Sequence, residues 1–176
     1  MDLSLYEDIF EQFKAKTGFK HILSFGGWAF STSPGTYPIF RSGVTDAERQ
    51  TFATNVANVR PPPPPLPCPL NPVADMNKFI MDNGMDGVDF DWEYPGAPDI
   101  PGIPPGSPED GANYLSFLNM VRAALPDQYS MSIAAPASFW YLKGFPIAEI
   151  SNVVDYIIFM TYDLHGQWDW ESAFSE

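Results

Sequence analysis

The chain has 176 residues, of which 45% are hydrophobic and 15% aromatic, enough apolar material for one globular core of ordinary size. Lysine and arginine number 9 against 22 acidic residues, and the net charge of -13 argues against a nucleic-acid partner, whose phosphates require a positive surface. No apolar run approaches the roughly 20 residues of a membrane span, so we expect no membrane partner.

The first predicted helix covers about residues 4–17. Ser4 and Glu7 form a capping box, and apolar residues recur at helical spacing until Gly18 ends the pattern. Because Met1 leads directly into this amphipathic helix, with neither a basic region nor a long apolar run, the sequence predicts no signal peptide in this chain.

A strand is predicted over residues 19–25, and it runs into Gly26, Gly27 and Trp28. Glycine lets another group approach the backbone closely, so these residues predict a small-residue floor at the end of the strand. Residues 29–44 are polar and contain glycine and proline, and they are predicted to form a loop.

A second capping box, formed by Thr45 and Glu48, predicts a helix that continues through Val56. The five prolines at 61–65 cannot continue this helix, and a further helical piece is predicted over 74–83. The sequence therefore predicts two helical pieces separated by a proline-rich segment.

Helix and strand continue to alternate through the rest of the chain. The predicted elements are a strand over 86–93, a Pro- and Gly-rich loop over 95–106, a helix that starts with Ser107 as its cap and Pro108 in its first position, a strand over 130–135, a short helix near Ile147 and a strand over 153–161. The strands are largely apolar, as in parallel strands covered by helices, and the charged groups cluster where strands end. This pattern predicts an α/β fold with its site at the strand ends, as in an α/β barrel.

The strand over 86–93 is the most informative segment. Side chains alternate across a strand, so Asp89, Asp91 and Glu93 share one face, opposite three large apolar side chains. Desolvation and mutual repulsion are expected to raise the pKa of at least one of these acids, leaving a protonated acid beside an ionised partner. That pairing suits glycosidic bond cleavage, with Glu93 at the end of the row as the proton donor.

Two other interpretations of this row remain open. A calcium-binding loop also spaces its acids by two residues, but it needs glycine and polar residues between them, whereas Phe90 and Trp92 intervene here. A solvated edge strand turns its acids toward water, although Val88, Phe90 and Trp92 require a buried opposite face.

The histidines and the cysteine give no pattern of metal ligands. His21 and His165 lie far apart in the sequence, and Cys68 is the single cysteine, so neither a zinc motif nor a disulfide framework is available. We therefore expect no cofactor and no metal, and we interpret each histidine as a partly exposed polar residue.

Three motifs occur in order, at residues 23–28 (LSFGGW), 86–94 (DGVDFDWEY) and 160–163 (MTYD). Together they closely resemble glycoside hydrolase family 18 chitinases, and residues 96–106 and 166–169 resemble the fungal killer-toxin-like branch. The resemblance implies a partial (β/α)8 TIM barrel, with the central four β/α units in this chain, and a retaining, substrate-assisted cleavage of chitin. It also implies an extracellular, monomeric protein whose partner is chitin or its oligosaccharides.

The resemblance assigns roles to individual residues. Glu93 resembles the general acid that later activates water, Asp91 the carboxylate that orients the acetamide of the sugar and stabilises the cation, and Asp89 the inner partner whose charge state couples to that of Asp91. Tyr162 resembles a phenol that hydrogen-bonds the acetamide oxygen, whereas Asp86 is interpreted as structural.

Six further residues are predicted to contact substrate: Gly26, Gly27, Trp28, Tyr94, Met160 and Asp163. Trp28 and also Trp140 can either stack on sugar rings or belong to the core. For Met160, a substrate contact and a purely packing role are both open.

The chain departs from the family pattern in two ways. A complete barrel has about 250 residues, so we interpret residues 1–176 as a partial catalytic domain with an uncovered interior and two exposed sheet edges. Residues 59–74 interrupt what should be one helix, and we interpret them as foreign to the fold, for example a translated intron. A polyproline surface loop is the alternative.

The predicted activity is hydrolysis of β-1,4-linked N-acetylglucosamine polymers. A non-catalytic chitin-binding lectin is one alternative, although lectins on this scaffold usually lack the catalytic acid. An inactive truncated fragment and an endo-β-N-acetylglucosaminidase are the other two alternatives.

Overall fold

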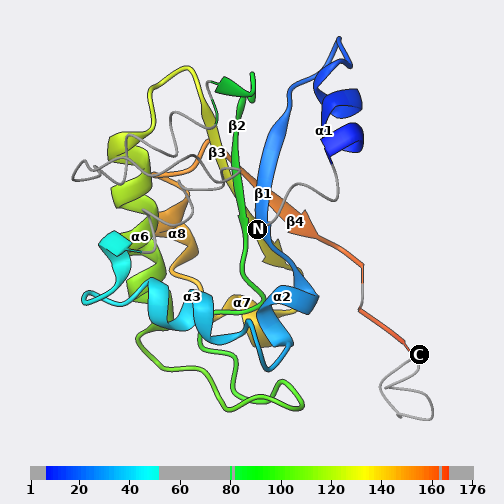
Figure 1. Ribbon diagram of the computed structural model, residues 1–176. Helices are drawn as coiled ribbons and strands as arrows, with labels where there is room; N and C mark the ends of the chain where they lie inside the picture. The colour runs from blue at the N-terminus through cyan, green and yellow to red at the C-terminus, as the bar shows by residue number, and fades with distance from the viewer. Residues whose placement is uncertain (1–6, 52–79, 81, 163, 167–176) are drawn as a thin grey trace, which may run out of the picture.

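The computed structural model describes residues 7–51, 80, 82–162 and 164–166. Within them, four strands form one parallel sheet in the order β1-β2-β3-β4 (Figure 1). The strands are β1 (Ile22–Gly26), β2 (Gly87–Asp91), β3 (Ser130–Pro136) and β4 (Tyr156–Met160). All four lie within or within one residue of the strands expected from the sequence, and the parallel α/β prediction is confirmed.

The register of the sheet builds layers of side chains across one face. Asp89 pairs with Ser24 of β1 and Ser132 of β3, and Ser132 in turn pairs with Tyr156 of β4. Two residues further along each strand, the next layer begins with Gly26 beside Asp91. Since the period of a strand is two residues, the acids of β2 lie on this layered face.

The opposite face of the sheet forms the hydrophobic core. Val88, Phe90 and Trp92 are at most 1% exposed, and burying one such side chain stabilises the fold by about 1.5–3 kcal/mol. Two helices lie along this side of the sheet (Figure 1): α6 (Asp110–Ala124) and α8 (Ile147–Ile150). Phe117 of α6 meets Phe90 edge to face, with 5.1 Å between ring centroids.

Three short helices lie at the carboxyl ends of the strands (Figure 1): α2 (Trp28–Thr32), α3 (Pro38–Gly43) and α7 (Phe139–Leu142). The predicted loop over 29–44 is therefore wrong, and α7 was not predicted. Pro38 occupies the first position of α3, where its fixed φ suits a helix. Phe40 stacks on Trp92 with 5.5 Å between ring centroids, so a long-range contact holds this segment helical.

Of the predicted helices, α1 (Glu7–Lys14) lies inside the range 4–17. The helix α6 begins at Asp110 rather than beside Ser107. The Asp110 carboxylate accepts the N–H groups of Gly96 (3.1 Å) and Ser107 (3.0 Å). These bonds close the base of the loop over 95–106 and leave residues 108 and 109 in a turn.

Some predictions fall outside the described residues. They include residues 59–74 and Asp163. They also include residues 52–56 of the helix predicted from Thr45, and residues 74–79 and 81 of the helix predicted over 74–83. In the described part of the chain, no helix combines the length and apolar character needed to cross a membrane.

In the described part of the chain, the two edge strands of the sheet expose side chains to solvent, whereas Asp89 and Ser132 in the middle of the layered face are at most 4% exposed. Ile158 is 44% exposed on the layered face, and Phe159 is 55% exposed on the opposite face of the same strand. Ser24 of the other edge strand is also exposed. The uncovered interior of a partial domain stays a prediction.

Candidate active site

Asp89 is the most firmly held acid of β2. The Ser24 and Ser132 hydroxyls, from the two neighbouring strands, each donate a 2.7 Å hydrogen bond to one of its carboxylate oxygens. The side chain is 4% exposed. Because each of its oxygens accepts a hydrogen bond from a neighbouring strand, this carboxylate has a fixed orientation.

Asp91 lies one layer further toward the strand end. Burial and, to a smaller extent, the nearby Asp89 charge together raise the pKa of Asp91 from 3.8 to about 6. Its Oδ1 atom is buried without a hydrogen-bond partner in the described part of the protein. The expectation that desolvation and repulsion raise the pKa of one acid is thus confirmed for Asp91.

Glu93 follows the end of β2 and is 8% exposed. Its backbone N–H donates to the Ser31 hydroxyl of α2 at 3.0 Å, so the chain leaving the strand is tied to a neighbouring helix. Burial raises the pKa of Tyr94, and the Glu93 charge and a hydrogen bond with Glu93 raise it further. The acid and the phenol therefore form a partly buried pair.

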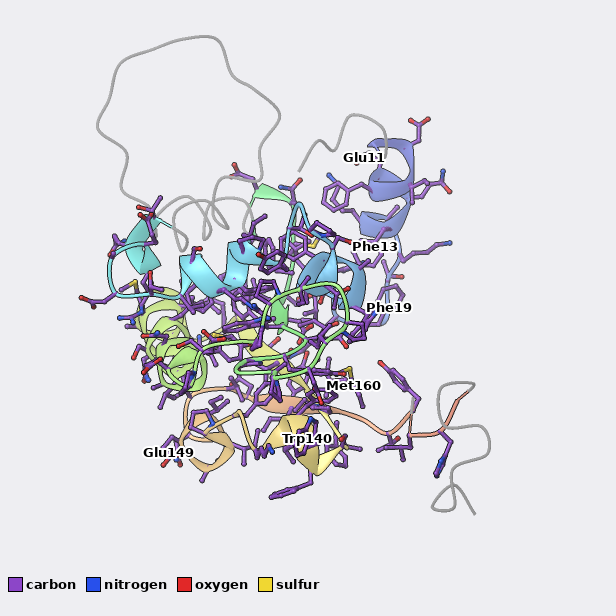
Figure 2. The ribbon with its side chains drawn as sticks, turned by 90° about the horizontal axis from the view of Figure 1, so that it is seen from below. Glu11, Phe13, Phe19, Trp140, Glu149 and Met160 are labelled. Atoms are coloured by element: carbon purple, nitrogen blue, oxygen red, sulfur yellow. The ribbon has the colours of Figure 1, made fainter. Side chains whose placement is uncertain are left out.

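A pocket of about 320 Å³ lies at the carboxyl ends of β2, β3 and β4. Its lining includes Glu93, Tyr94, Tyr141, Met160 and Tyr162. Figure 2 looks onto this end of the molecule, with Met160 labelled at the end of β4. All of these residues except Tyr141 were predicted as site residues, from two separate motifs. The fold thus brings the two motifs to one cavity.

Met160 and Tyr162 differ in how they line this pocket. Met160 is 6% exposed, so it both packs and faces the cavity, and the two open interpretations are compatible. Tyr162 is 66% exposed. Asp163, the next predicted substrate contact, lies outside the described residues.

The two glycines after β1 pack against β2. A side chain on Gly26 would place its Cβ 2.0 Å from the Asp91 carbonyl oxygen, and the φ of Gly26 is +122°. The Gly27 N–H donates to the same carbonyl at 2.8 Å. The predicted close approach is therefore made by the chain itself, and a contact of either glycine with substrate stays a prediction.

Trp28 and Trp140 are 51% and 49% exposed, so neither belongs to the core. The Trp28 ring lies 6.4 Å from that of Tyr94, which in turn stacks on Tyr141 at 4.7 Å. The Trp140 indole N–H donates to the Asp99 carboxylate at 2.9 Å. This exposure is consistent with stacking of either indole on a sugar ring.

Asp86 lies at the opposite end of the strand from the pocket. Its carboxylate accepts the His21 backbone N–H at 2.7 Å, which supports the structural role expected for it. No group of three or more His, Cys, Asp or Glu side chains that could hold a metal occurs among the described residues.

The family described as Glycosyl hydrolases family 18 matches residues 1–175. The chain belongs to this family. The chain is 54% identical over 160 residues to "Secreted chitinase LysM12" of Penicillium expansum, covering 91% of this chain and 9% of that protein. It is 47% identical over 175 residues to "Killer toxin subunits alpha/beta" of Kluyveromyces lactis, covering 98% and 14%. The predicted family and its killer-toxin-like character are confirmed.

Solved structures of family 18 proteins share this fold. Chitinase ChiA74 from Bacillus thuringiensis superposes with a TM-score of 0.66 at 32% identity, covering 90% of this chain and 23% of that one. The Ostrinia furnacalis Group II chitinase catalytic domain 2 gives a TM-score of 0.69 at 25% identity, covering 96% and 39%. The four-stranded sheet is thus part of a TIM-barrel architecture, and the chain spans well under half the length of these relatives.

Sequence reasoning missed several residues of this family 18 site. Ser24 and Ser132 could have been found, because both share the parity of Asp89 in adjacent parallel strands. Ser31 carried no signal, since its contact with Glu93 spans 62 residues of sequence. Tyr141 was also missed, because its helix, α7, was not predicted.

Proposed function

We propose that this chain carries the acid residues of a chitinase that hydrolyses β-1,4 links between N-acetylglucosamine units. One observation carries the proposal: Glu93 is buried and lines the pocket. It lies two residues after Asp91, whose pKa is raised to about 6. The chitinase names of the fungal relatives support this substrate class.

In the first step, Glu93 protonates the glycosidic oxygen as the bond to the anomeric carbon breaks. The acetamido oxygen of the same sugar attacks that carbon, so an oxazolinium ion forms and no protein nucleophile is required. The Glu93 carboxylate then removes a proton from water as the water attacks the anomeric carbon, and the configuration is retained.

Asp91 orients the acetamide N–H and stabilises the positive charge of the oxazolinium ion. Its partnerless Oδ1 atom provides the acceptor for that N–H. Asp89, fixed by two serine hydroxyls, holds a charge beneath Asp91 and couples to its titration. Tyr162 donates from its phenol to the acetamide oxygen, across the pocket that it shares with Glu93.

Substrate profiling of the product of the complete coding sequence tests this function. We expect hydrolysis of N-acetylglucosamine oligomers and none of their deacetylated counterparts, because the acetamide supplies the nucleophile. Cleavage of an N-glycan core without cleavage of these oligomers would instead establish the endo-β-N-acetylglucosaminidase. Binding of the oligomers without turnover would establish the lectin.

A second proposal concerns the 176-residue chain by itself, which we infer to be an inactive fragment. The exposed Ile158 and Phe159 on the edge strand β4 support this inference, because uncovered sheet edges favour association over a stable monomer. We expect no cooperative unfolding transition for the purified chain. A sharp two-state transition together with turnover would overturn this proposal.

The place of action that we propose is outside the cell. The relative named "Secreted chitinase LysM12" supports it.

A further inference from the structure

The hydrogen-bond ladder between β1 and β2 ends with an exchange of partners. The last pair of the ladder is Gly26 beside Asp91, and the Gly27 N–H donates to the Asp91 carbonyl at 2.8 Å. The bonds of a regular parallel ladder alternate between the two strands. The next donor would therefore be the Glu93 N–H, and its acceptor would be the Gly27 carbonyl.

The Gly27 carbonyl and the Glu93 N–H each take another partner, and both partners belong to Ser31. Gly27 directly precedes α2 with a φ of +95°, and its carbonyl accepts the Ser31 N–H at 2.9 Å. The Glu93 N–H donates to the Ser31 hydroxyl at 3.0 Å. The Ser31 side chain thus takes the place of the ladder carbonyl, so β1 can lead into α2 (Figure 1) while the Glu93 N–H keeps an acceptor.

This contact is buried, and it completes the support of the main chain at Glu93. Ser31 is 4% exposed and Glu93 is 8% exposed. The preceding residue, Trp92, is anchored in the core, where Phe40 stacks on it. The main chain that carries the Glu93 carboxyl is therefore held by the core at Trp92 and by the Ser31 hydroxyl. Without that hydroxyl, a buried N–H would lack its acceptor, which favours a shift of the chain toward another one.

We propose that Ser31 is a positioning residue for the general acid: its hydroxyl holds the main chain at Glu93 so that the carboxyl reaches the glycosidic oxygen. Ser31 does not line the pocket that contains Glu93, so it acts through Glu93 and not by contact with the sugar. Proton transfer depends steeply on the distance and direction of the reacting groups. This inference rests on the proposed chitinase function.

Two substrates separate this role from a merely structural one, both assayed with the product of the complete coding sequence. Cleavage of the N-acetylglucosamine tetramer needs the proton from Glu93, whereas the dinitrophenyl glycoside of the dimer has a leaving group that departs as an anion. Ser31→Ala is expected to lower kcat/KM for the tetramer by about tenfold and that for the glycoside by less than about twofold. Equal losses on both substrates, or no loss on the tetramer, would overturn the proposal.

Thr32→Val is the matched control. Thr32 also lies on α2, but its hydroxyl donates within the helix, to the Trp28 carbonyl at 2.8 Å. This variant is expected to keep both rates. Ser31→Thr retains a hydroxyl and is expected to keep the wild-type ratio of the two kcat/KM values, a ratio that does not depend on the fraction of folded protein. A ratio as low as that of Ser31→Ala would contradict the role of the hydroxyl.

Hydrogen exchange tests the same contact without a substrate. Exchange of the Glu93 amide, followed by mass spectrometry with residue-resolving fragmentation, is expected to be faster in Ser31→Ala than in the wild type and in Thr32→Val. Unchanged exchange in Ser31→Ala would overturn the inference. If the wild type hydrolysed no oligomer, the proposed function would fail, whereas faster exchange would still support Ser31 as the residue that holds the main chain at Glu93.

Discussion

The two sides of the pocket that we propose to be catalytic are built differently. On the β2 side, Asp89 is held by two serine hydroxyls and Glu93 is tied through its backbone to α2. On the other side, Tyr162 is 66% exposed. The groups to which we assign the chemistry are therefore held by buried hydrogen bonds, whereas Tyr162, which we propose to contact the sugar, lies on an exposed surface. We therefore expect substitutions on the two sides to affect different properties.

The largest effect on stability is expected at Trp92, which lies in the core beside Glu93. This side chain is 1% exposed and packs against Phe40 and Tyr114. Trp92→Ala is expected to lower the free energy of unfolding by about 3–5 kcal/mol. In the complete gene product, this loss would lower the urea concentration that abolishes activity. Phe139→Ala, on the exposed side, is expected to change it by less than about 0.5 kcal/mol. Similar costs for both variants would contradict the comparison.

The next effect concerns the pH dependence set by the acid side. Asp91 must be ionised to stabilise the cation, and its pKa is about 6, so kcat/KM is expected to fall as pH drops through about 6. Asp89→Asn removes the smaller of the two causes of this raised pKa. We therefore expect the acidic limb of the profile to move to lower pH without reaching the value of an exposed aspartate.

A pH profile of the hydrolysis of a soluble oligomer measures this shift. Glu149→Gln on α8 is a suitable control, because it removes an exposed carboxylate on the far side of the sheet (Figure 2). A limb that stays in place or moves upward in Asp89→Asn would show that Asp89 does not act on Asp91.

The smallest effect is expected at Tyr162 on the open side. Tyr162→Phe removes one hydrogen bond to the acetamide, and an exposed phenol contributes at most about 1.5 kcal/mol, so kcat/KM is expected to fall by about tenfold or less. Tyr156→Phe is the matched control, since Tyr156 is also partly exposed on β4 but does not line the pocket. An equal loss in both variants would remove Tyr162 from the site.

The difference between the two sides also explains what could be predicted from the sequence. Asp89, Asp91 and Glu93 were placed on one face because strand alternation is a local property of the chain. The family resemblance likewise assigned Met160 and Tyr162 to the sugar site, and both line the same pocket.

The parts that could not be predicted depend on contacts between distant residues. The helices α2 and α3 were missed because Ser31 and Phe40 are held by the segment at Trp92 and Glu93, more than 50 residues away. The hydrogen bond from Trp140 to Asp99 spans 41 residues, and no local pattern predicts it. Local periodicity thus identified the acid strand but not the helices that support its end.

The role of Glu93 is the central claim, and one substitution tests it most directly. In the product of the complete coding sequence, Glu93→Gln is expected to lower kcat on N-acetylglucosamine oligomers by about 10²- to 10⁴-fold, because the amide cannot donate the proton or activate water. Oligomer binding should persist, and Glu149→Gln should keep the parental rate. Hydrolysis by Glu93→Gln at the parental rate would contradict the assignment of Glu93 as the general acid.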